Sequence, residues 1–174
     1  MLLRSRPATL DDLVSHREPL AFAYGRDRAL LDRMPKVWES WLSMRSVWSI
    51  AVEDLDRSTD RRVVFLGLSA FISEPLFDRL ASGQAPSIGG QVARRFLETG
   101  EGPLTLPELA DRQSGVGLCS VNLHSFCPLV RPGEATPLEI AEFAVAKNFR
   151  DMRGYRFRSC LRDVFSAESR AAYE

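Results

Sequence analysis

His124 is the residue best suited to proton transfer, and it lies within the apolar, strand-like run 117–126. An imidazole titrates near neutral pH, so it can take a proton from a reacting group and act as a general base. A histidine inside a predicted strand is more often a hydrogen-bonded residue of the core or of a sheet face. His124 is therefore a candidate base, and the structural alternative stays open.

A glycine pair at a predicted helix start has the residue types that bind phosphate. The segment consists of Ser87, Ile88, Gly89, Gly90 and Gln91. Backbone N–H groups that carry no side-chain bulk can converge on a phosphate, and the helix N-terminus adds positive potential. A plain turn is the alternative interpretation of the same glycines.

Two apolar runs near the middle of the chain predict a β-hairpin. Residues 48–53 alternate apolar with small or polar side chains, and 62–72 are almost continuously apolar, with the charged, turn-rich segment 54–60 between them. The longer run should be the central strand, with both of its faces covered by other elements. Further along, the strand-like run 117–126, a helix from Pro137 and a second strand-like run after Gly154 predict a βαβ unit.

The helices are predicted from caps and periodicity. Thr9, followed three residues later by Asp12, predicts a helix that starts near Leu10. The run 28–44 has helical spacing, but Pro35 should kink it or split it into two pieces. Three shorter helices are expected at Pro75–Leu80, Gly89–Glu98 and Leu106–Arg112. The tryptophans Trp38, Trp41 and Trp48 are expected in the core, although a groove lined by them could also hold an acyl chain.

The two ends of the chain resemble those of the GNAT-type N-acetyltransferases. The segment 6–13 looks like the first strand and helix start of that family, and 146–155 looks like its closing helix-to-strand segment. The resemblance implies an α/β (α+β) fold, with a mixed central β-sheet flanked by helices in a single domain over residues 1–174. It also implies acyl transfer from acetyl-CoA or another acyl-CoA to a small-molecule or protein amine.

The acyl-CoA motif of this family is an Arg or Gln, two residues, Gly, one residue, then Gly or Ala, leading into a helix. The segment 112–117 has these letters, but a strand-like run follows it. Ser87–Gln91 does not match the residues of the motif, but it has the expected structural context, because its glycine pair begins a predicted helix. The resemblance therefore implies that Ser87–Gln91 holds the pyrophosphate of the cofactor.

The resemblance also points to catalytic positions. The family often places a tyrosine four residues before the closing glycine to protonate the departing thiolate, and Arg150 holds that position here. An arginine can stabilise a thiolate by charge but is a poor proton donor. The family typically draws its base from the central strands, where Glu53 and Glu74 are candidates alongside His124. Glu74 and His124 are the expected catalytic residues, and either carboxylate could equally be a solvated strand-end residue.

A second hypothesis follows from Arg150 and from the displaced glycine motif. The chain could have kept the fold and lost the chemistry, and serve as a non-catalytic sensor or interaction domain. GNAT-like domains can stand beside DNA-binding modules in transcriptional regulators. Whether such a module follows residue 174 is not determined by these residues.

Composition limits the partners. The chain has 23 Lys and Arg against 23 Asp and Glu, so no global field attracts nucleic acid or an anionic membrane surface. Cys119, Cys127 and Cys160 follow no metal-ligand spacing, and with only 2 histidines a metal site is not expected. No run has the length of a membrane span, and no signal sequence opens the chain. We expect a soluble, cytoplasmic protein, and the sequence leaves a homodimer open.

Overall fold

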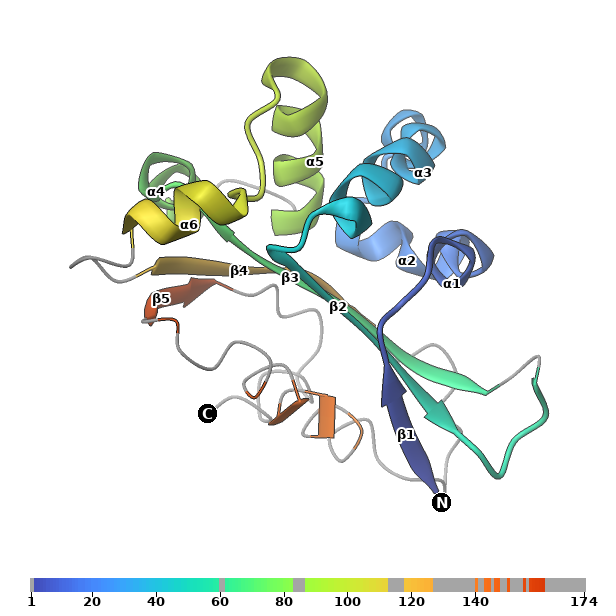
Figure 1. Ribbon diagram of the computed structural model, residues 1–174. Coiled ribbons are helices and arrows are strands. Elements are labelled where there is room, and N and C mark those ends of the chain that lie inside the picture. Colours follow the sequence, from blue (N-terminus) through green and yellow to red (C-terminus); the bar gives the residue numbers. More distant parts are fainter. Residues whose placement is uncertain are drawn as a thin grey trace.

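Five strands form one mixed sheet, and helices α1 to α5 lie on one side of it (Figure 1). The computed structural model describes residues 2–59, 62–82, 87–112, 118–126 and 157–161, together with 140, 143–144, 146–147, 150 and 155. The strands are β1 (Leu3–Arg6), β2 (Val47–Asp54), β3 (Val63–Ile72), β4 (Leu118–Phe126) and β5 (Phe157–Leu161). The helices are α1 (Leu10–Ser15), α2 (Arg17–Leu20), the 3₁₀ helix η1 (Ala21–Tyr24), α3 (Arg28–Ser43), α4 (Glu74–Ala81), α5 (Ile88–Thr99) and α6 (Leu106–Arg112).

The strand order in the sheet follows the chain, β1-β2-β3-β4-β5. Neighbouring strands are antiparallel except β4 and β5, which are parallel. Strands β2 and β3 form the predicted hairpin, and β3 is the central strand, as its continuous apolar run predicted. Parallel neighbours need a crossover, and the described residues between 140 and 150 in that connection are helical. The predicted mixed sheet flanked by helices is confirmed.

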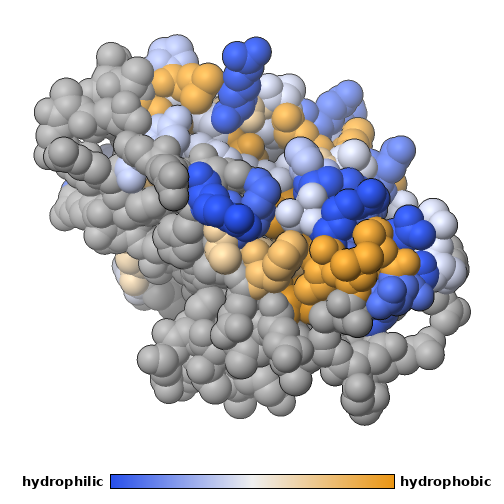
Figure 2. Space-filling view, turned by 60° about the horizontal axis from the view of Figure 1, so that its bottom comes forward, coloured by the Kyte–Doolittle hydropathy of each residue, from blue (hydrophilic) through white to orange (hydrophobic). Residues whose placement is uncertain are grey.

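The two faces of the sheet have separate hydrophobic layers. On the first face, Leu66 and Leu68 of β3 pack with apolar side chains of α1 to α5. On the second face, Phe65 packs with Ile140 and Ala144 of the crossover helix, which Figure 1 draws in orange below the sheet. Figure 2 views the molecule from that lower side, where hydrophobic side chains adjoin strongly hydrophilic ones. Both faces of β3 are therefore covered, which explains why its sequence does not alternate.

Helix α1 begins where the sequence predicted. The Thr9 side chain accepts from the Asp12 backbone N–H at 3.2 Å, and the Asp12 carboxylate accepts from the Thr9 N–H at 2.7 Å. This reciprocal capping box satisfies two backbone donors that the helix itself cannot satisfy.

Of the two effects predicted for Pro35, a split of helix α3 is wrong. The helix runs without interruption over 16 residues, Arg28–Ser43, and buries one apolar face. The buried residues of that face are Leu30, Leu31, Met34, Val37, Trp38 and Trp41. An interior proline costs about 3 kcal/mol, whereas each large apolar side chain contributes about 1.5–3 kcal/mol when fully buried. The free energy gained by burying this apolar face therefore outweighs the cost of the proline. Trp38 and Trp41 are core residues and line no groove.

Candidate functional site

The parallel strands β4 and β5 pair over only part of the length of β4. Strand β5 pairs with Leu118–Val121, whereas β4 continues to Phe126. On its other edge β4 pairs with β3 from Cys119 to Phe126. Among the residues that the structure describes, no strand therefore pairs with 122–126 on the β5 side. The described part of β5 ends at Leu161, opposite Val121.

A β-bulge lies at the same place. Leu68 of β3 pairs with His124 and Ser69 pairs with Asn122, so Leu123 is an extra residue in β4. A bulge bends its strand and increases the local twist. The structure thus places the backbone of His124 one residue beyond the bulge.

Glu74 lies at the other end of the sheet. It is the first residue of α4, after the Ser73 N-cap and the end of β3. Ile72, the last residue of β3, pairs with Cys119, and His124 is five positions further along β4. At about 3.3 Å per residue, Cys119 and His124 are about 16 Å apart along β4, and Glu74 lies beyond the Cys119 end. The structure does not bring Glu74 and His124 together, so they cannot share one proton-transfer step.

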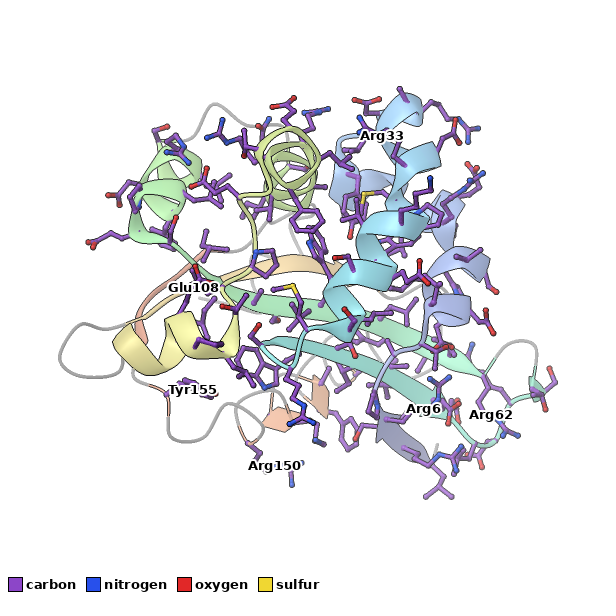
Figure 3. All side chains as sticks on the ribbon, turned by 45° about the horizontal axis from the view of Figure 1, so that its top comes forward. Arg6, Arg33, Arg62, Glu108, Arg150 and Tyr155 are labelled. Carbon is purple, nitrogen blue, oxygen red and sulfur yellow. The ribbon has the colours of Figure 1, made fainter. Side chains whose placement is uncertain are left out.

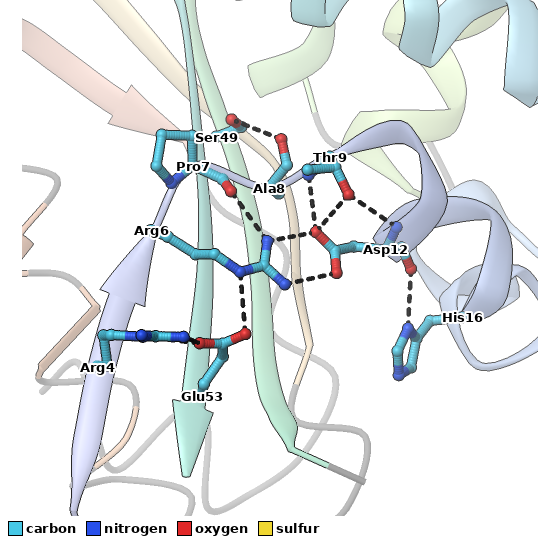
Figure 4. Close-up of polar contacts among 9 residues, drawn as sticks. All are labelled: Arg4, Arg6, Pro7, Ala8, Thr9, Asp12, His16, Ser49 and Glu53. Carbon is cyan, nitrogen blue, oxygen red and sulfur yellow. Dashed lines mark hydrogen bonds and ion pairs between the residues drawn. The ribbon is translucent and has the colours of Figure 1, made fainter. Parts of the chain in front are cut away.

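Glu53 has a structural environment (Figure 4). Its carboxylate accepts from Arg4 Nη2 at 2.6 Å and from Arg6 Nε at 3.0 Å, and the residue is buried. Burial alone would raise the pKa of Glu53, but the hydrogen bonds and charges of Arg4 and Arg6 hold that pKa below its ordinary value. A carboxylate stabilised in this way is a weak base, so the surroundings of Glu53 do not favour a catalytic role. Its ion pairs with Arg4 and Arg6 join β2 to β1 instead.

The glycine pair at the start of α5 is buried. Ser87, the N-cap, is 1% exposed, and its hydroxyl accepts from the Gly90 N–H at 3.1 Å. A Cβ on Gly90 would lie 2.4 Å from Ser87 Oγ and 3.2 Å from the backbone carbonyl of Tyr24 in η1. Gly90 thus has a packing role, the close approach of η1 to α5, that requires no ligand. That Ser87–Gln91 binds a pyrophosphate stays a prediction.

The predicted cofactor residues come from opposite faces of the sheet. Ile88 and Val92 of α5 pack on the first face, whereas Ile140 and Ala144 of the crossover helix pack on the second. Arg150 belongs to that crossover helix and is exposed (Figure 3). Within the described part of the chain Arg150 forms no ion pair. The structure therefore does not bring Arg150 and the glycine pair together.

Other predicted features are only partly described. Gly115, Gly117, Cys127 and Gly154 lie outside the described residues. In the described ranges no three His, Cys, Asp or Glu side chains group as metal ligands. No helix in those ranges is long and apolar enough to span a bilayer.

Comparison with known proteins identifies the fold. No protein-family model matches the chain, and no curated protein sequence matches it. A predicted acetyltransferase of Clostridium acetobutylicum, crystallised with acetyl-CoA, is similar in structure with a TM-score of 0.54 and 12% identity, over 99% of this chain and 86% of that one. A ribosomal-protein-alanine N-acetyltransferase of Brucella melitensis biovar Abortus gives a TM-score of 0.44 and 12% identity, over 99% and 88% of the two chains. The chain has a divergent form of the GNAT-type N-acetyltransferase fold.

Proposed function

We propose that this chain is an acyl-CoA-dependent N-acyltransferase that acts on an amine of a small molecule or of a protein. The observation that carries the proposal is the parallel pair of β4 and β5 beside the bulge at Leu123, in a mixed sheet of the GNAT-type fold. The fold and the acetyl-CoA in the structurally similar acetyltransferase support it.

In the proposed complex the extended arm of an acyl-CoA lies along residues 122–126 of β4. That arm carries two amide groups, which can hydrogen-bond to the backbone of 122–126 as an added strand does. Because main-chain groups make these contacts, they need no particular side chain. This explains how a divergent sequence can keep the binding mode while it lacks the usual letters of the cofactor motif.

In the proposed reaction His124 is the general base. The amine nitrogen attacks the thioester carbonyl, and His124 takes the proton that the nitrogen loses as the new C–N bond forms. Collapse of the tetrahedral intermediate breaks the C–S bond and releases CoA as a thiolate, which takes up a proton from the protonated His124 or from water. Glu74 is the alternative base, and its distance from His124 means that only one of the two serves the reaction.

Truncated cofactors test which residues bind the pyrophosphate. S-acetylpantetheine lacks the nucleotide and the pyrophosphate, so a variant that loses only a pyrophosphate contact binds acetyl-CoA more weakly and S-acetylpantetheine equally well. Arg150→Met and Gln91→Ala form a suitable pair, because their helices lie on opposite faces of the sheet. We expect one of the two variants to show this selective loss. If neither shows it, the pyrophosphate binds elsewhere.

The proposed function is tested first by binding and then by turnover. Acetyl-CoA at a hundred times its Kd should add about 2.7 kcal/mol to the free energy of unfolding, which a thermal shift detects. Turnover is followed as free thiol released when a panel of amines is added. If neither acetyl-CoA nor longer acyl-CoAs raise Tm, the proposal is wrong. Binding without thiol release from any amine would instead support a non-catalytic acyl-CoA sensor.

A further inference from the structure

We draw no further inference here: the strongest candidate, the aromatic cluster that the half-buried Trp48 and Tyr155 form with Phe71 beside α6, carries none because nothing in the described part of the chain shows what covers it.

Discussion

Arg6 donates two hydrogen bonds to the carboxylate of Asp12, at 2.6 and 2.8 Å, and thereby ties strand β1 to the first turn of helix α1 (Figure 4). The same guanidinium donates to Glu53 of β2 at 3.0 Å. Burial raises the pKa of Asp12, but the hydrogen bonds from Arg6 and Thr9 outweigh burial and lower that pKa from 3.8 to about 2. One arginine therefore connects three elements at the start of the fold.

The lowered pKa of Asp12 makes stability depend on pH. Its contribution is complete above the ordinary pKa and disappears as the pH falls through about 2. Asp12→Asn should cost about 2 kcal/mol at pH 7, and the difference from the wild type should shrink between about pH 4 and pH 2. Urea denaturation at several pH values measures this. The control is Asp11→Asn, an exposed neighbour in the same helical turn, whose difference from the wild type should be small at every pH.

Gly90→Ala should destabilise the protein by about 1–3 kcal/mol, because the added Cβ would overpack Ser87 and the Tyr24 carbonyl. At an unhindered helical position the same change would stabilise the protein by up to about 1 kcal/mol. The sign of the change in the free energy of unfolding therefore shows whether Gly90 is needed for packing. Gly100→Ala serves for comparison: its φ is 77° and nothing lies within 4 Å, so only backbone strain of about 1–2 kcal/mol is expected. A stabilised Gly90→Ala variant with weaker acetyl-CoA binding would support the pyrophosphate role instead.

Tyr24→Phe should cost about 1–3 kcal/mol, because Trp38 Nε1 donates to the Tyr24 hydroxyl at 2.9 Å and both residues are fully buried. Burial also raises the pKa of Tyr24 above its ordinary 10.0. In the folded protein the tyrosinate absorbance of Tyr24 should therefore appear only well above that pH. Tyr155→Phe is the control and should change stability by less than about 0.5 kcal/mol. An equal loss in both variants would contradict the assigned role of the buried hydrogen bond.

His124→Gln should lower kcat by about 10²- to 10⁴-fold and leave the Kd of acetyl-CoA within a few fold, because a general base acts on the reaction and not on cofactor binding. His16→Gln is the control, since His16 lies at the end of α1 and its Nδ1 contacts the Asp12 carbonyl. If Glu74→Gln loses turnover and His124→Gln does not, Glu74 is the base.

Elements with local signals could be predicted from the sequence. Thr9 and Asp12 form a capping box within four residues, so their spacing alone indicates the start of α1. The hairpin of β2 and β3 follows from two apolar runs with a charged turn between them, and α5 follows from Ser87 before an amphipathic run. In each case the deciding interactions join residues that are close in the chain.

Only the tertiary structure decided the features of the candidate site. The bulge at Leu123, the pairing of Leu118–Val121 with β5 and the placement of Arg150 and Gly90 on opposite faces depend on strand register and on which helix covers which face. The contact of Trp48 with Tyr155 joins residues far apart in sequence. Sequence patterns indicate which residues are buried and whether a segment is a helix or a strand. The register between strands, and the face of the sheet that each helix covers, are set only when distant apolar surfaces pack together. For that reason the sequence by itself determined the elements and the fold class, and packing between distant segments determined which candidate residues lie together and which lie apart.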